Sequence, residues 1–124
     1  MIPNAEKVAL YTLRGALDAP VYSVPPKGVS LPYVTAYRAG GNMSNIVTDA
    51  PLIIVNCYAA DPLEAAELAN RAREAMFDIR ASWVDGVWVR WWDESGGTGR
   101  YPEPDIGGTR YQFNGVLTVA TNTG

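Results

Sequence analysis

The run from Leu52 to Ala59 is apolar except for Asn56, and a long segment with helical periodicity follows directly. Apolar side chains on both faces of an extended segment indicate a strand covered on both sides, so we expect this strand at the centre of a sheet. The next segment, Pro62 to Arg80, begins with the signals of a helix start. Asp61 can act as the N-cap, a proline takes the first helical position and Glu64 the third.

One stripe of this helix is apolar and rich in alanine. Its members are Ala65, Leu68, Ala69, Ala72, Ala75, Met76 and Ile79. The opposite face is polar and places Glu67 and Arg71 at the i,i+4 spacing of an ion pair. Because small side chains let a helix approach a sheet closely, we expect the helix to lie flat on the sheet that contains the apolar strand.

The N-terminal third predicts a helix and two strands. We expect a helix from Pro3 to Leu17 and a short strand from Val21 to Val24, which ends at two consecutive prolines. Tyr33 to Arg38 is rich in aromatic and β-branched residues and stops at Gly40-Gly41. This strand and the apolar strand should form an antiparallel hairpin with a long tip.

The C-terminal third predicts two further strands. Val87 to Trp92 has strand composition, and the glycine- and proline-rich segment from Ser95 to Gly108 is expected to be a loop. The last strand alternates, with Tyr111, Phe113, Leu117 and Val119 on one face and Arg110, Gln112, Asn114 and Thr118 on the other. Gly115 interrupts the inward row, which indicates either a bulge or a close approach of the helix backbone.

Together these patterns predict one α+β domain over residues 1–124. Its sheet should be single, mixed and mainly antiparallel, with the N-terminal helix and the long alanine-rich helix packed on it. A chain of 124 residues is long enough for one core and too short for two. We find no basic segment followed by an apolar run at the N-terminus and no apolar stretch of membrane-spanning length, so no membrane association is expected.

Charge and composition narrow the function classes. The formal net charge is -3, which disfavours a nucleic-acid binder that relies on phosphate contacts. The single cysteine, Cys57, lies in the apolar strand and is expected to be a buried small hydrophobe rather than a nucleophile. There is no histidine, which removes the commonest general base and metal ligand.

Other groups give little support for catalysis. Asp93-Glu94 are sequence neighbours, and Glu103 and Asp105 flank a proline in the expected loop, so neither pair sits on a rigid scaffold. The run Gly96 to Arg100 lacks the lysine and the strand-to-helix context of a phosphate-binding loop. We therefore expect no enzyme, no catalytic or metal site and no cofactor.

Tryptophans provide the main candidates for binding. Strand alternation sends Trp88 and Trp92 to one face and Trp91 to the other. One set can pack in the core and the other under a loop or the first helix, or the outer set can anchor a protein interface. Arg90, on the face of Trp88 and Trp92, would suit such an interface as a stacked cation.

The remaining interface candidates lie at turns and on the last strand. Arg38, Gly40 and Gly41 lie where the hairpin tip either reaches a neighbour or forms a flexible turn. The segment from Ser95 to Gly108 is expected to be mobile in the free subunit and ordered by a partner. Its Arg100 and Tyr101 are candidate contacts, with Tyr101 folding back on the sheet as the alternative, and Arg110 is a further interface candidate.

The layout resembles the tail-terminator proteins of long-tailed bacteriophages. The resemblance rests on the N-terminal helix, the strand that ends in the proline break, and the strand that ends in Tyr37-Arg38-Ala39-Gly40-Gly41. It continues through Thr48-Asp49-Ala50-Pro51 before the apolar strand, the alanine-rich helix, and Gly108-Thr109-Arg110-Tyr111 at the start of the last strand. It spans nearly the whole chain, although each motif is short.

The resemblance implies a structural protein of the virion. Such a subunit assembles in the host cytoplasm into a ring, expected to be a hexamer, that caps the head-proximal end of the tail tube. The ring stops tube growth and provides the head-tail joining surface, so its partners are the tube protein and a head-side connector. DNA passes through the lumen without specific binding, which an acidic subunit would favour. The alternatives are another head-tail connector or neck protein, or a monomeric ligand-binding α+β module.

Overall fold

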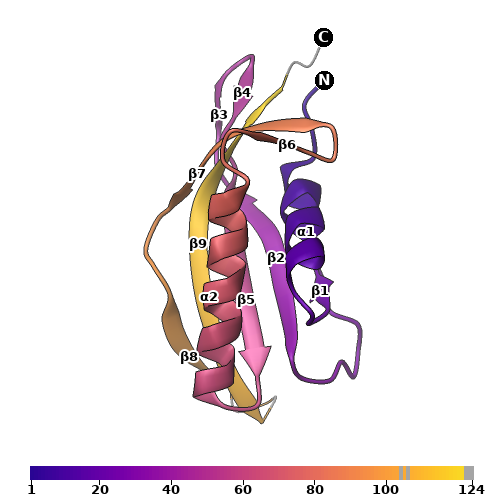
Figure 1. Cartoon of the computed structure of the whole chain (residues 1–124), viewed down its shortest axis with the longest axis vertical. Coiled ribbons are helices and arrows are strands. Elements are labelled where there is room, and N and C mark those ends of the chain that lie inside the picture. The colour runs from indigo at the N-terminus through magenta and orange to yellow at the C-terminus, as the bar shows by residue number, and fades with distance from the viewer. Residues whose placement is uncertain (104, 106, 122–124) are drawn as a thin grey trace.

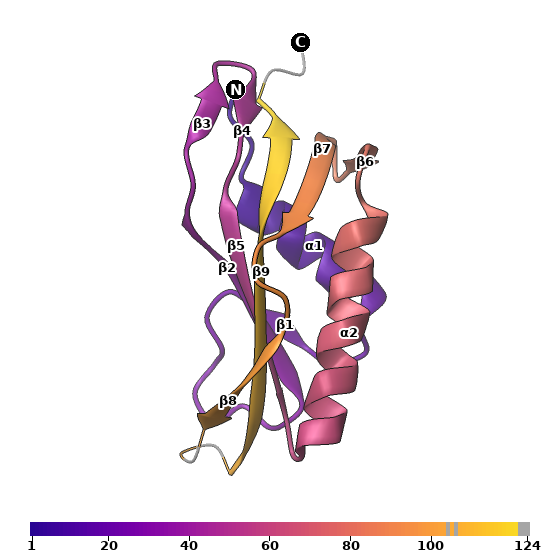
Figure 2. The same ribbon diagram turned by 90° about the vertical axis from the view of Figure 1, so that its left-hand side faces the viewer.

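Two helices lie on one face of a twisted sheet in the computed structural model, which describes residues 1–103, 105 and 107–121 (Figure 1). The view from the side shows both helices on the same side of the strands (Figure 2). In chain order the elements are α1 (Ala5–Ala16), β1 (Val21–Tyr22), β2 (Tyr33–Gly40), β3 (Met43–Asn45), β4 (Thr48–Asp49), β5 (Leu52–Ala59), α2 (Pro62–Asp78), β6 (Ser82–Val84), β7 (Val87–Glu94), β8 (Gly99–Glu103) and β9 (Gly108–Ala120).

The sheet is mixed and mainly antiparallel, as expected for the α+β class. β5 lies between β2 and β9, and both pairings are antiparallel, whereas the short β1 runs parallel to β2. β9 is the longest strand. It pairs with β5 and β4 along one edge, and with β8 and β7 along the other. The central position of β5 and its hairpin with β2 are therefore confirmed.

Helix α2 begins as the sequence indicates. The carboxylate of Asp61 accepts a hydrogen bond from the backbone N–H of Glu64 at 2.9 Å, and the apolar stripe from Ala65 to Met76 is buried. The helix ends at Asp78, two residues before the expected end. The expected ion pair of Glu67 with Arg71 does not form among the described residues, where Arg73 instead binds Glu94 of β7.

Only one face of β5 is fully covered. Ile53, Val55 and Cys57 point toward the helices and have no exposed surface. Leu52, Ile54 and Tyr58 on the other face are half-buried. The expectation of a strand covered on both sides is confirmed only in part, because Asn56 on this face is also buried but both helices pack on the opposite face of the sheet.

The hairpin tip and the end of α2 contain strands that the sequence patterns missed. The chain between β2 and β5 forms a small antiparallel hairpin, β3–β4, which projects beyond the helices at the upper end of the molecule in Figure 1. After α2, β6 forms a tight hairpin with β7, and Asp85 and Gly86 at its turn have positive φ angles of 48° and 79°. Two- and three-residue strands are too short to produce a periodic signal.

The expected loop from Ser95 to Gly108 is wrong over Gly99–Glu103. These residues form β8 and pair with β9, so that Arg100 lies opposite Tyr111. Pairing with a long neighbouring strand outweighed the weak strand propensity of glycine and proline. The mobility expected of this segment in the free subunit stays a prediction, and residues 104 and 106 lie outside the described residues.

The alternation along β9 is confirmed. Phe113, Leu117 and Val119 point into the core and have no exposed surface. Gly115 continues this inward row, and a Cβ atom built on it would lie 2.5 Å from Cζ2 of Trp92. The interruption therefore reflects the close approach of a tryptophan ring from β7, and neither of the two expected causes applies.

Candidate protein interaction surface

Arg38 holds the base of the projecting hairpin together. Its guanidinium forms two hydrogen bonds to the carboxylate of Asp49, at 2.7 and 3.0 Å, and donates to the carbonyl groups of Gly40 and Gly41 at 3.1 and 2.8 Å. Asp49 is buried, so this bidentate pairing compensates for the loss of its hydration. The donors of Arg38 are engaged within the subunit, and we assign this residue a structural role.

Gly40 and Gly41 also have local roles. Both have positive φ angles, 141° and 92°, which side-chain-bearing residues rarely adopt. A Cβ atom at Gly41 would collide with the backbone carbonyl of Ala50. The two glycines therefore let the chain leave β2 and pass close to the segment before β5.

The apolar surface of the tip lies beyond these residues. Ile46 is 77% exposed, and Met43 and Val47 are also exposed. The tip is fastened to the end of β9, because the backbone N–H of Thr121 donates to the carbonyl of Val47 at 3.0 Å and its hydroxyl binds the carbonyl of Ile46. Sequence reasoning missed these three residues, although three large apolar side chains between glycine and aspartate could have indicated an exposed apolar turn.

The tryptophans of β7 do not follow simple alternation. The register of β7 against β9 shifts between Val89 and Trp91, so Arg90 is an extra residue in a bulge. As a result Val89 and Trp92 both point into the core, and Trp92 has no exposed surface. The expected common face of Trp88 and Trp92 is wrong, and Trp92 is corrected from an interface candidate to a core residue.

Three aromatic residues around the bulge remain accessible. Trp83 of β6 is 64% exposed, and its ring lies 5.3 Å from that of the half-buried Trp88. Trp91 is exposed, and the guanidinium of Arg80 lies 4.8 Å from its ring centroid and 5.0 Å from that of Phe77. The role of Arg90 as a stacked cation at an interface stays a prediction, although the bulge removes the shared face of Trp88 and Trp92 on which it was expected. The bulge places Arg90 at the surface, and Arg80 occupies the stacked position.

Arg100, Tyr101 and Arg110 come together on the β8–β9 hairpin. Tyr101 lies opposite Arg110 in the pairing of the two strands, and the guanidinium of Arg110 lies 5.0 Å from the centroid of its ring. Arg110 also donates to the side-chain oxygen of Asn56 at 3.4 Å. Tyr101 thus lies against the sheet with part of its ring exposed, while Arg100 is exposed at the edge strand.

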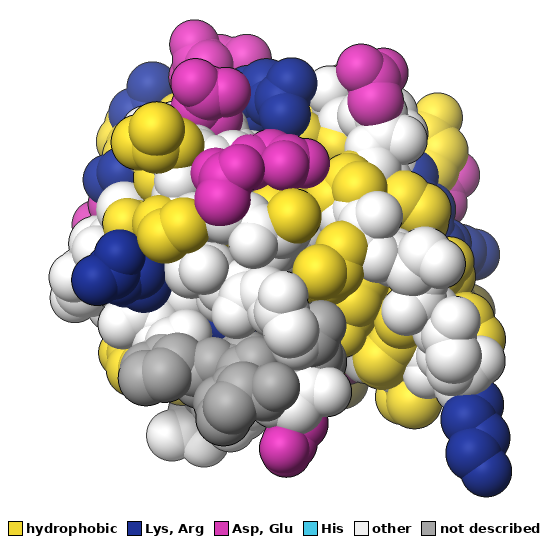
Figure 3. All heavy atoms as spheres, turned by 90° about the horizontal axis from the view of Figure 1, so that it is seen from below, with side chains coloured by type: hydrophobic (Ala, Val, Ile, Leu, Met, Phe, Trp, Pro, Cys, Tyr) yellow, Lys and Arg dark blue, Asp and Glu magenta, His cyan; other side chains and the backbone are white. Residues whose placement is uncertain are grey.

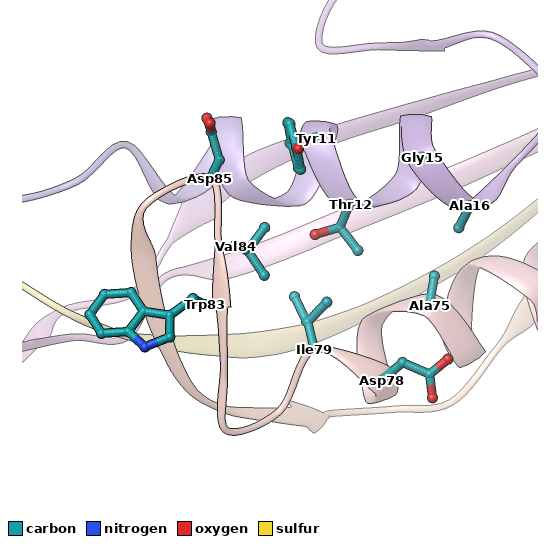
Figure 4. A pocket seen from close by; sticks show the side chains of 10 residues that line it. All are labelled: Tyr11, Thr12, Gly15, Ala16, Ala75, Asp78, Ile79, Trp83, Val84 and Asp85. Atoms are coloured by element: carbon teal, nitrogen blue, oxygen red, sulfur yellow. The ribbon is translucent and has the colours of Figure 1, made fainter.

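A groove on the helical face was not expected from the sequence. It has a volume of about 350 Å³ and opens between α1, the end of α2 and the β6–β7 turn (Figure 4). Its lining residues are Tyr11, Thr12, Gly15, Ala16, Ala75, Asp78, Ile79, Trp83, Val84 and Asp85. Tyr11 and Trp83 are 57% and 64% exposed. A groove assembled from three separate elements leaves no compact motif in the sequence.

The lower end of the molecule carries the loop between β1 and β2. Val24, Pro26, Lys27 and Gly28 of this loop are exposed, and Val24 is 80% exposed. Figure 3 views this end and shows apolar side chains on both sides of it, with the larger contiguous group on the right, and a basic side chain that projects past the rim. This loop and the tip hairpin thus place exposed apolar side chains at opposite ends of the subunit.

The surroundings of Cys57 and Arg73 in the fold shift the pKa values of these two side chains. Burial raises the pKa of the Cys57 thiol to about 12, against a smaller opposing effect of Arg71, so the thiol is protonated at neutral pH. The hydrogen bond to Glu94 raises the pKa of Arg73, and the two side chains tie α2 to β7 at 2.6 and 2.8 Å. Within the described part of the chain, no three histidine, cysteine or acidic side chains lie close enough to hold a metal ion.

The comparisons with known proteins find similarity to solved structures. No protein-family model and no curated protein matches the chain. Separately, no helix in the described residues has the length and apolar character to cross a membrane. Among solved structures, the fold is similar to a chain of the "Virion of native gene transfer agent (GTA) particle", with a TM-score of 0.64 and 13% sequence identity. The similarity covers 87% of this chain and 84% of that chain. The protein therefore shares its fold with a chain of a gene transfer agent virion.

Proposed function

We propose that this protein is a structural subunit of a phage-like virion and, more specifically, that it forms the ring that caps the head-proximal end of the tail tube. The observation that carries the proposal is the shared fold with a gene transfer agent virion chain, which extends over most of both chains. In this role the ring stops tube growth and presents a joining surface for the head. The subunit acts by shape and contact, without catalysis or a cofactor.

The surface of the subunit supports an assembly role. The tip hairpin exposes Met43, Ile46 and Val47 at one end, and exposed aromatic residues border a groove on the helical face. Contiguous exposed apolar side chains on a small protein are typical of surfaces that partners cover. We propose that the tip contacts the tube protein, and that Trp88, Arg90, Arg100, Tyr101 and Arg110 contribute to contacts with neighbouring subunits or a head-side connector.

The charge of the chain fits a channel-forming subunit. With a net charge of -3, a ring of identical subunits, which we propose to be a hexamer, repels the phosphate backbone. DNA would then pass through the lumen without specific binding. We propose assembly in the host cytoplasm and a final location in the virion, at the junction of tail and head.

Tube assembly in vitro tests the capping role. The tube protein of the same virion is polymerised with and without this protein, and tube lengths are measured by negative-stain electron microscopy. Capping predicts tubes that stop growing and carry a ring at one end only. A protein bound along the tube wall, or tubes of unchanged length, would overturn the proposal.

Two variants make this test specific for the tip. The double variant Ile46→Ser and Val47→Ser removes exposed apolar side chains from the tip, so it should fold and lose capping. Leu63→Ser removes an apolar side chain at the start of α2 that is 80% exposed, and this variant should cap normally. Binding of the protein to isolated heads rather than to tubes would favour the alternative of a neck protein.

The groove favours a second candidate function, a monomeric module that binds a small ligand. It is apolar and bordered by two aromatic side chains, as many ligand sites are. This function predicts a monomer that neither caps tubes nor joins rings, and whose thermal unfolding temperature rises with a small-molecule ligand. The tube assay separates the two functions, since only the ring subunit changes tube length.

A further inference from the structure

The groove between α1, α2 and the β6–β7 turn has the chemistry of a site for an extended apolar segment. Ala75, Ile79 and Val84 form an apolar floor, and the rings of Tyr11 and Trp83 stand at its sides (Figure 4). Rigid aromatic rings with large exposed surfaces are the usual walls of grooves that bind proline-containing segments, because a polyproline II segment is already extended and loses little entropy on binding.

The rim of the groove is acidic. Asp78 ends α2 and Asp85 lies in the β6–β7 turn, and both line the groove. Neither carboxylate forms an ion pair with a described residue. A negative charge at the C-terminus of a helix also faces the negative end of the helix dipole. The rim therefore favours a ligand that carries a positive charge beside its apolar part.

The loop between β1 and β2 offers such a segment. Val24, Pro25, Pro26 and Lys27 combine an exposed valine, the only consecutive prolines of the chain and an exposed cation. Lys27 forms no ion pair with any residue that the structure describes. The order of these residues, apolar then proline then basic, complements a groove with an apolar floor, aromatic sides and an acidic rim.

We infer that the groove of one subunit binds the segment from Val24 to Lys27 of a second copy of this chain. In this contact the prolines lie between Tyr11 and Trp83, and the ammonium group of Lys27 pairs with Asp78 and Asp85. The inference rests on the proposed function only for its biological setting. It adds to that function the contact that joins neighbouring subunits of the ring.

The positions of the two surfaces fit a repeating contact. No residue of the loop lines the groove of its own subunit. The loop lies at the lower end of the subunit, whereas β6 lies near the upper end (Figure 1). A contact between two different patches is heterologous, and it generates a closed ring when the rotation between neighbours closes. Each subunit then uses its loop on one neighbour and its groove on the other.

A peptide experiment tests the binding directly. A synthetic peptide of residues 21–30 contains no tryptophan, so tryptophan fluorescence of the full-length protein reports binding alone. We expect a saturable blue shift as Trp83 loses contact with water, with a Kd of about 10 μM to 1 mM. No saturable change up to the millimolar range would overturn the inference.

Variants locate the peptide on the protein. Asp78→Asn and Asp85→Asn should each weaken binding about 2- to 5-fold, and asparagine suits the positive φ of the turn at position 85. Asp93→Asn removes an exposed charge from β7 outside the groove lining and should leave binding unchanged. Equal affinity of the double variant Asp78→Asn and Asp85→Asn for the peptide would place the peptide elsewhere and overturn the inference.

Mixing full-length variants tests the ring contact. A loop variant, with Pro25→Ser, Pro26→Ser and Lys27→Glu, keeps its groove, and a groove variant, Trp83→Ala, keeps its loop. Each alone should form no rings on tubes, and the mixture should form only pairs, detected by native mass spectrometry. Rings formed by either variant would overturn the inference and leave the capping role intact. Peptide binding by a protein that never caps tubes would refute the capping role alone.

Discussion

At the scale of single residues, the packing of Trp92 depends on the missing side chain of Gly115. A Cβ atom at this position would lie 2.5 Å from the Trp92 ring and 2.8 Å from the backbone carbonyl of Asp93. Gly115→Ala therefore overpacks the core, and we expect it to lower the free energy of unfolding by about 1 to 3 kcal/mol. The midpoint of urea unfolding, followed by tryptophan fluorescence, measures the change.

Gly15 provides the matched control for this substitution. It lies in α1, and a Cβ atom built on it meets no atom within 4 Å. Gly15→Ala should raise the free energy of unfolding by about 0.5 to 1 kcal/mol, because alanine restricts the unfolded chain and favours the helix. Equal effects of the two substitutions would contradict the steric explanation.

Cys57 should link stability to pH in the alkaline range. Its thiol is neutral in both states below pH 9, whereas between pH 9 and about 12 only the unfolded chain ionises it. The unfolded state then binds fewer protons than the folded state, so this residue lowers stability by up to about 1.4 kcal/mol per pH unit above pH 9. We expect a shallower loss of stability from pH 9 to 10.5 in the Cys57→Ala variant.

The comparison must concern the slope, because Cys57→Ala also changes packing by an amount that does not depend on pH. Parallel pH profiles of the two proteins would show that the thiol ionises equally well in the folded state. A second measurement is independent of stability. At pH 8 a thiol reagent should modify Cys57 only after urea unfolds the protein, since burial keeps the thiol protonated and inaccessible.

At the scale of elements, the contact of α2 with the sheet depends on small side chains. Ala72 has no exposed surface and lies in the middle of the buried stripe. Ala72→Leu should cost about 1 to 3 kcal/mol by overpacking, as measured by thermal or urea unfolding. Glu67→Leu, on the exposed face of the same helix, is the control and should change stability by less than about 0.5 kcal/mol.

The loops and edge strands should differ in their sensitivity to proteases. Lys27 lies in a ten-residue connection without regular structure between β1 and β2, whereas Arg100 lies within β8 and its strand is paired with β9. We expect limited trypsin digestion of the free protein to cut first after Lys27, because cleavage requires a segment that can leave the fold. Mass spectrometry of the first fragments identifies the site.

First cleavage after Arg100 would mean that β8 opens readily, and it would support the interpretation of this segment as mobile in the free subunit. Assembly adds a second reading of the same experiment. If the Val24 to Lys27 segment is covered by a neighbouring copy, cleavage after Lys27 should be slower in assembled rings than in the free protein.

At the scale of the whole molecule, capping should depend on shape and surface rather than on one ionisable group. Replacing Asp93, Glu94, Glu103 or Asp105 one at a time by the amide should leave tube capping intact. Glu94→Gln alone should also lower stability, by about 1 kcal/mol, because it weakens the charge-assisted hydrogen bonds to Arg73. Complete loss of function in one amide variant that still folds would support a catalytic carboxylate instead.

The sequence by itself determined the elements whose signals are local. The cap at Asp61, the alanine-rich stripe of α2 and the alternation along β9 each depend on residues that are close in the chain, so their patterns predict the structure directly. The same reasoning predicted the mixed, mainly antiparallel sheet, the central place of β5 and the burial of Cys57. The helix cap, the apolar stripe and the alternation follow from interactions between residues that are close in the chain.

Tertiary structure decided the features in which distant segments meet. The bulge at Arg90 places Trp88 and Trp92 on opposite faces of β7, and Trp92 then packs over Gly115 of β9. β8 became a strand because β9 extends far enough to pair with it. The guanidinium of Arg38 pairs with the carboxylate of Asp49, eleven residues away in the chain, and is therefore engaged within the subunit. The groove needs α1, α2 and the β6–β7 turn together, and no local pattern records how three separate elements pack.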